Sequence, residues 1–184
     1  MAGGKKVQQI LTTPGVLEGY LCDEKWGKDV FTQEDVKEIR DSWMGMWGLD
    51  DDDGITKAKL LASSLVLKPQ REGGGNNIYK DNIPAFLDML PPKDREAWIA
   101  MELIVPPQGT SNYLVRAGGG RESAVRTEVV SELGIFGWAL FGGPDGAVSE
   151  KEIGWLVRTK GKDSNEGGVA AGFSVLDSLL LIDD

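Results

Sequence analysis

The predicted fold rests on residues 140–160, which read LFGGPDGAVSEKEIGWLVRTK. A Pro-Asp-Gly turn is followed by Ser149 and, three residues later, by Glu152. At this spacing the hydroxyl and the carboxylate each bond an otherwise unpaired backbone N–H at a helix start, which is a capping box. The apolar residues that follow recur at helical spacing, namely Ile153, Leu156 and Val157. We therefore predict a tight turn that leads into an amphipathic helix.

The N-terminal half shows a similar pair of helices with a turn between them. Residues 31–47 have Thr32 as a natural N-cap and Asp35 in the first turn, where a carboxylate complements the helix dipole. A second helix is predicted over residues 57–67, before a proline. Four consecutive aspartates, residues 50–53, lie between the two helices. We interpret this acidic run as a solvated turn rather than a metal site.

Shorter amphipathic patterns continue along the chain, separated by glycine-rich breaks. Helices are predicted over residues 83–90, with Pro84 in the first turn, over residues 93–103 and over residues 121–133. Polar linkers are predicted at residues 70–77 and 162–168, and a short strand at residues 113–115. Residues 133–141 fit either a helix weakened by two glycines or a buried strand, so their structure stays open.

These patterns indicate a mainly α fold of helix-turn-helix units, in one domain or two small lobes, with room for minor β structure. A chain of 184 residues is long enough for either arrangement. The expected organisation is an N-terminal arm (1–30), an N-terminal helical lobe (31–92), a connecting helix with a glycine-rich loop (93–125), and a C-terminal helical lobe (126–184).

The composition is typical of an intracellular globular protein. Apolar residues make up 41% of the chain, yet no stretch approaches the roughly 18 apolar residues that span a bilayer. The first nine residues lack the apolar segment of a signal peptide. Cys22 is the single cysteine, so no intrachain disulfide can form, which agrees with a reducing compartment. We therefore expect a cytoplasmic protein.

Charge and histidine content argue against two classes of function. The net charge of −9 opposes the approach of nucleic acid over most of the surface. The chain has no histidine, which removes the commonest general base, the usual zinc ligand and the usual partner of a nucleophilic serine or cysteine. We therefore expect a protein that is not an enzyme and has no cofactor, and we rank an enzyme that uses carboxylates alone as the least favoured hypothesis.

The helix-turn-helix units resemble the EF-hand superfamily, in its calmodulin and myosin-light-chain branch. The resemblance covers residues 31–67 and 140–160, with a poorer copy over residues 75–90. A calcium loop needs oxygen ligands at its first positions and a bidentate glutamate at position 12. Phe141 occupies the first position of one loop, and Leu60 occupies position 12 of the other. The resemblance therefore implies paired helices that do not hold calcium tightly.

Our first hypothesis is a non-enzymatic binding protein, similar to a degenerate EF-hand light chain, that holds an amphipathic partner helix in a groove. The aromatic residues proposed to line this groove are Trp43, Trp47, Trp138, Phe141 and Trp155. Core packing is the competing interpretation for most of the tryptophans.

The alternative hypothesis is a self-assembling structural protein, such as a viral matrix or nucleocapsid-type subunit. In that case the glycine-rich loop at residues 118–120 would contact other subunits, or the phosphates of a nucleic acid, through flanking guanidinium groups. The proposed phosphate contacts are Arg116, Arg121 and Arg126.

Overall fold

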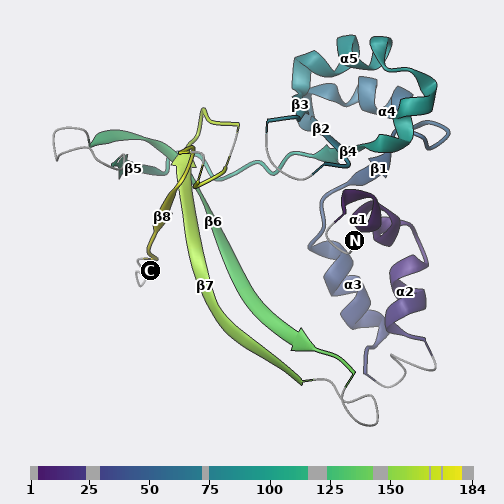
Figure 1. The fold of residues 1–184 in the computed structure, drawn as a ribbon, viewed down its shortest axis with the longest axis horizontal. Helices are drawn as coiled ribbons and strands as arrows, with labels where there is room; N and C mark the ends of the chain where they lie inside the picture. The colour runs from purple at the N-terminus through teal and green to yellow at the C-terminus, as the bar shows by residue number, and fades with distance from the viewer. Residues whose placement is uncertain are drawn as a thin grey trace. The chain divides into compact units, whose positions relative to one another are not determined.

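A computed structural model describes residues 4–23, 30–71, 75–115, 124–142, 149–165, 167–170 and 172–179 (Figure 1). The chain forms two compact units, Met1–Val105 and Pro106–Asp184, which we describe separately as unit 1 and unit 2. The finer limits expected at residues 30, 92 and 125 stay predictions.

Unit 1 begins with three short helices, α1 (Lys5–Thr12), α2 (Val16–Leu21) and α3 (Gln33–Asp41). The predicted cap of α3 is confirmed. The backbone N–H of Asp35 donates to the Thr32 hydroxyl over 3.2 Å, and the Asp35 carboxylate accepts from the Thr32 backbone N–H over 2.7 Å. The helix ends at Asp41 rather than at residue 47, because residues 46–48 pair with another strand instead.

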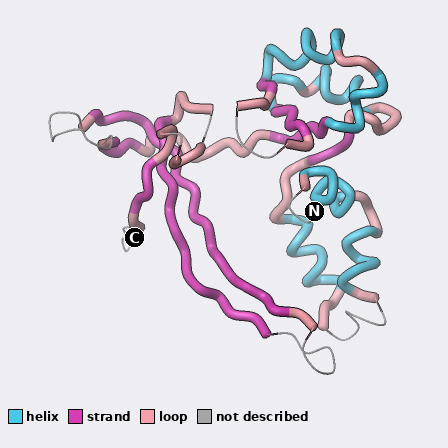
Figure 2. Tube along the Cα trace, in the orientation of Figure 1, coloured by secondary structure: helices cyan, strands magenta, loops and turns pink. Residues whose placement is uncertain are grey.

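The sheet of unit 1 has the strand order β1-β4-β2-β3, and every pair in it is antiparallel. Its strands are β1 (Met46–Gly48), β2 (Leu65–Pro69), β3 (Ile78–Tyr79) and β4 (Trp98–Glu102). Two helices, α4 (Gly54–Leu60) and α5 (Ile83–Met89), pack against one face of this sheet (Figure 2). The core between them contains Trp47, Leu49, Ala58, Ala62, Leu65, Leu67, Ile83, Leu87 and Ala100.

Short 3-10 helices connect these elements: η1 (Ala62–Ser64), η2 (Lys80–Asn82) and η3 (Pro92–Ala97). The helices predicted over residues 57–67 and 93–103 are therefore wrong in their second halves, which form β2 and β4. Residues 65–67 are buried from both sides of the sheet. A strand of this kind reads as a continuous apolar run, which periodicity alone does not separate from a helix. Pro84 does lie in the first turn of α5, as predicted.

The described part of unit 2 contains four antiparallel strands in the order β5-β6-β7-β8. Their bounds are β5 (Ser111–Leu114), β6 (Val125–Leu140), β7 (Ser149–Gly161) and β8 (Val175–Asp177). The short strand predicted near residue 113 is confirmed. Residues 133–141, left open above, are mostly strand, and the helix predicted over residues 121–133 is wrong wherever the structure describes it.

The helix predicted from the capping box is also wrong. Ser149 pairs with Leu140 and Glu152 pairs with Gly137 across the β6–β7 ladder, so neither side chain caps a helix. Side chains alternate between the two faces of a strand, so Val157 and Thr159 lie on the same face, where both are buried. The turn at residues 143–148 lies outside the described residues. The fold is therefore α+β with two antiparallel sheets, not mainly α.

The long β6–β7 hairpin bends along its length (Figure 1). A register shift lies between Phe136 and Gly137, where two residues of β7 face one residue of β6. Gly154 sits at this bulge with φ of 143°, a conformation that side chains with a Cβ rarely adopt. A bulge of this kind bends and twists a hairpin locally.

Candidate functional site

The glycine-rich segment at residues 70–77 is a strand connection rather than a linker between lobes. It joins β2 to β3, which pair through Val66–Tyr79 and Leu67–Ile78. Lys68 lies on β2 just before this loop and is half-buried. Because side chains alternate along a strand, Lys68 points to the face of the sheet opposite to the core residues Leu65 and Leu67.

Helix α1 fixes the start of this loop with two lysines. The backbone N–H of Lys6 donates to Gln70 Oε1 over 2.9 Å, and Lys5 Nζ donates to the carbonyl oxygen of Arg71 over 3.3 Å. Lys6 Nζ also lies 2.5 Å from the Asp50 carboxylate. The charge of Lys6 is therefore paired with Asp50, while Lys5 of α1 contacts the start of the loop and Lys68 of β2 lies just before it. Lysine ammonium groups of this kind suit an anion such as a phosphate.

An apolar cavity of about 350 Å³ lies on the same face of the sheet as Lys68. Met101 of β4 and its cross-strand partner Met46 line it, and Ile99, two residues before Met101, pairs with Lys68. The remaining lining residues come from α1 and from the segment after α3: Gln8, Leu11, Thr12, Ser42, Trp43 and Met44. Thioethers and an indole form an adaptable apolar wall that suits a planar ring.

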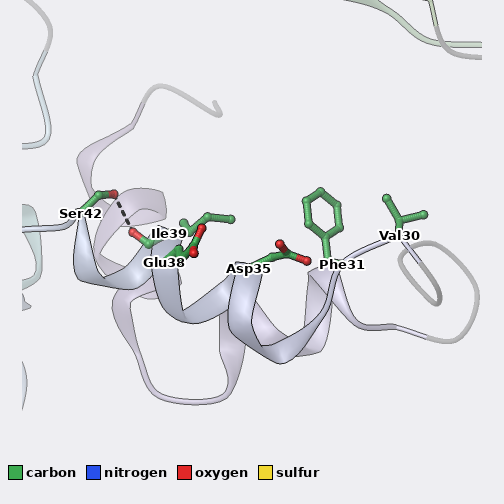
Figure 3. Close-up of a pocket in the computed structure, with 6 residues that line it drawn as sticks. All are labelled: Val30, Phe31, Asp35, Glu38, Ile39 and Ser42. Carbon is green, nitrogen blue, oxygen red and sulfur yellow. Dashed lines mark hydrogen bonds between the residues drawn. The ribbon is translucent and has the colours of Figure 1, made fainter.

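A second cavity, of about 490 Å³, lies along α3 and, unlike the first, has carboxylates in its lining (Figure 3). Figure 3 shows Asp35 and Glu38 beside the apolar Val30, Phe31 and Ile39. Hydrogen bonds from Thr32 hold the pKa of Asp35 below its usual value, so this carboxylate stays charged. Two carboxylates repel an anion, so this cavity does not suit a phosphate.

Two of the four aspartates at residues 50–53 bond other groups of unit 1. The hydrogen bond and charge of Lys6 lower the pKa of Asp50. Asp51 accepts a hydrogen bond from the backbone N–H of Gly48 over 2.9 Å. Within the described ranges, no group of three or more potential metal ligands comes together.

The five aromatic residues predicted to form one groove have different environments. Trp47 is a core residue whose Nε1 donates to the carbonyl oxygen of Gly54 over 3.1 Å, so it is not a surface contact. Trp43 lines the apolar cavity of unit 1. Trp138, Trp155 and Phe141 belong to the hairpin segment of unit 2 and are exposed.

The predicted phosphate contacts at residues 116 and 121 lie outside the described residues. Arg126 is exposed on β6, opposite Tyr113, and its role stays a prediction. Sequence reasoning missed Lys68 and the loop after it, although a lysine shortly before three glycines was a visible signal.

Unit 2 has a second group of cations, at the end of β7 beside the loop at residues 162–174. Arg158 pairs with Glu132, and Lys160 Nζ donates to the carbonyl oxygen of Ser164 over 2.6 Å. The Ser174 hydroxyl donates to the carbonyl oxygen of Gly167 over 3.0 Å. Of these contacts, the one between Lys160 and Ser164 joins the loop to β7.

Comparison with known proteins identifies the family. Residues 1–181 match the family described as eukaryotic glutathione synthase, ATP binding domain. The chain belongs to this family. It is 41% identical to the chloroplastic glutathione synthetase of Arabidopsis thaliana, over 99% of this chain and 32% of that protein. It is also 41% identical to the glutathione synthetase of Bos taurus, over 97% of this chain and 36% of that protein.

A solved structure supports the fold. The glutathione synthetase-like effector from Globodera pallida, in its apo form, superposes with a TM-score of 0.64 at 23% identity, over 96% of this chain and 34% of that one. The chain thus spans about a third of the length of the relatives that it matches.

Family membership corrects several predictions. The EF-hand resemblance is wrong, because the glutathione synthase family covers nearly the whole chain. The hypotheses of a non-enzymatic light-chain-like protein and of a structural subunit are wrong as well, because the relatives are named as synthetases, which are enzymes. As for membranes, no described helix has the length and apolar character needed to cross one.

Proposed function

We propose that this chain forms the ATP-binding part of a glutathione synthetase, an enzyme that makes glutathione. The match of residues 1–181 to an ATP-binding domain family carries the proposal. The described geometry of unit 1 supports it, because a nucleotide needs both an apolar slot for its base and positive charge for its phosphates.

The two halves of such a site lie on one face of the unit 1 sheet. The cavity walled by Trp43, Met46 and Met101 would take the planar base. Lys68, which lies on this face just before the glycine-rich loop, would bind the phosphates. The absence of histidine does not weaken this proposal, because binding and orienting a triphosphate requires cations and N–H donors rather than a general base.

Titration of the chain with ATP and Mg²⁺ in a calorimeter tests ATP binding directly. We expect saturable binding in the parent chain and at least about tenfold weaker binding in Lys68→Gln, because a charge-assisted hydrogen bond contributes about 1.5–3 kcal/mol. Lys93→Gln is the matched control, since Lys93 is an exposed lysine on η3, and its affinity should equal that of the parent.

ATP and inorganic triphosphate test the roles of the apolar cavity and of Lys68 separately. Inorganic triphosphate lacks the base, so Trp43→Ala should weaken ATP binding but leave triphosphate binding unchanged. Circular dichroism of each variant checks that unit 1 remains folded. Absence of ATP binding by the folded parent chain at millimolar nucleotide contradicts the proposal.

From the same family match, we also propose that this chain takes part in the ATP-dependent synthesis of glutathione. Expression of this chain together with the polypeptide that completes a synthetase should restore ATP-dependent glutathione formation in cells that lack it, and Lys68→Gln should reduce it. We also propose a reducing compartment such as the cytoplasm, which the single Cys22 supports; one relative is named as chloroplastic.

A further inference from the structure

Among the described residues, no third strand lies beside the outer part of the β6–β7 hairpin, residues 130–142 and 149–156. We name this segment the distal hairpin. β5 pairs only with residues 125–128 of β6, and β8 pairs only with residues 157–159 of β7. Figure 1 shows β6 and β7 continuing together beyond both short strands. The described part of unit 2 therefore leaves both edges of the distal hairpin unpaired.

One face of the hairpin changes from buried to exposed along its length. Val157 is 3% exposed, whereas its cross-strand partner Leu133 is 49% exposed. The next pair outward on the same face, Ile135 and Trp155, is 67% and 54% exposed. The apolar pattern of the face thus continues beyond the point where the described part of unit 2 covers it.

The opposite face carries apolar side chains as well. Phe136, Trp138 and Leu140 alternate with the first set along β6, and they are 48%, 44% and 66% exposed. The Phe136 ring lies over Gly134, where an added Cβ would stand 2.9 Å from the ring. The ring therefore covers backbone of its own strand, but its outer side remains exposed.

A two-stranded ribbon of this kind is at best marginally stable in water. Contiguous exposed apolar surface on a soluble protein marks an interaction site. The distal hairpin combines apolar side chains on both faces with two unpaired edges, so it needs a covering partner.

We propose that the distal hairpin docks against the polypeptide that completes a glutathione synthetase, whether this belongs to the same chain or is supplied as a separate one. The match covers 97–99% of this chain but only 32–36% of the relatives from Arabidopsis thaliana and Bos taurus, so about two thirds of each relative lies outside it. The hairpin segment therefore occurs in proteins that carry additional polypeptide. The proposal rests on family membership and does not require ATP binding.

Hydrogen exchange with and without the partner tests the docking. The chain is co-expressed with the part of the Arabidopsis thaliana synthetase that it does not match, and the two are purified together. Amides of the distal hairpin should exchange at least about tenfold more slowly in the complex than in the chain alone, because a covered hairpin opens less often. Ile135→Asp and Trp155→Asp should weaken the complex at least about tenfold in light-scattering titrations.

Leu60→Asp is the matched control, because Leu60 is an 82% exposed leucine on α4, away from the hairpin. It should form the complex with unchanged affinity. Equal affinity of the hairpin variants and the parent overturns the proposal. So does hairpin protection that rises with the concentration of this chain alone, because a second copy would then be the partner.

A second measurement tests the docking without requiring two separate polypeptides to assemble. In the intact Arabidopsis thaliana enzyme, the segment that matches the distal hairpin should exchange slowly. Exchange there as fast as in the isolated chain overturns the proposal even if the two-part complex does not form. ATP titration of the hairpin variants should match the parent, so failure of docking and failure of nucleotide binding are distinguishable.

Discussion

The sheets that the structure describes in the two units have the same number of strands but differ in how they are covered. In unit 1, α4 and α5 bury one face and α1 packs against strands β1 and β4 on the other. In unit 2, the described hairpin has an exposed outer half with apolar side chains on both faces. The difference teaches that unit 1 contains its own core, whereas the described part of unit 2 leaves both faces of the distal hairpin uncovered.

The largest expected effect comes from the core of unit 1. Leu67→Ala should lower the free energy of unfolding by about 2–5 kcal/mol, because Leu67 is fully buried and truncation leaves a cavity. The corresponding truncation in the distal hairpin, Ile135→Ala, should cost less than about 1 kcal/mol in the isolated chain. Urea unfolding followed by tryptophan fluorescence measures both. Similar losses in the two variants would show that the units are equally well covered.

The bulge of the hairpin gives the next effect. Gly154→Ala should destabilise the hairpin by about 1–3 kcal/mol, since its φ of 143° is strained for alanine. Hydrogen exchange of the β6–β7 amides should become at least about fivefold faster. Gly19→Ala is the control in unit 1: this glycine lies within α2 with open space around it, so alanine should stabilise by up to about 1 kcal/mol.

The helix cap of unit 1 comes third. Thr32→Ala should cost about 1 kcal/mol, because the N-terminus of α3 loses the hydroxyl that accepts from the Asp35 backbone N–H. Thermal unfolding measured by circular dichroism checks this. Ser149→Ala tests the contrast in unit 2, where the same type of side chain lies in a strand and caps nothing, and no comparable loss is expected.

The smallest effect is a pH dependence. Arg40 bonds both carboxylate oxygens of Glu18, over 2.5 and 2.6 Å, and lowers the pKa of Glu18 to about 2. Because the folded-state pKa lies below the ordinary value of 4.5, this pair stabilises above pH 4.5 and loses its contribution as the pH falls toward 2. Glu18→Gln should melt below the parent at pH 6, and the difference should shrink by pH 2–3. A constant difference across this range contradicts the assignment.

Local chemistry was predictable from the sequence, and long-range pairing was not. Thr32 and Pro84 act within one turn of their own position, so their roles could be predicted correctly. Leu65 and Leu67 are strand residues because both pair with β4 and Leu67 also pairs with β3, and nothing within the segment itself reports those neighbours. Ser149 and Glu152 have capping-box spacing, but pairing with β6 outweighs it.

The candidate site was missed for a related reason. Its parts are separated in sequence: lysines at the start of the chain, Lys68 before a glycine-rich loop, and Met101 on a strand far downstream. No contiguous phosphate-binding motif joins them, so they form one site only when β2 and β4 pair. Trp43, predicted to contact a partner helix, lines a cavity in unit 1, and its role in binding stays a prediction.

The two contacts of Lys6 affect how mutagenesis of this region should be designed. Its backbone N–H bonds Gln70, at the start of the glycine-rich loop, and its side chain bonds Asp50, 44 residues further along the chain than Lys6 itself. One residue of α1 therefore ties the acidic turn to the loop. A mutational scan restricted to residues 70–77 would overlook Lys6 and Asp50, and natural variation at Asp50 should be accompanied by compensating variation at Lys6.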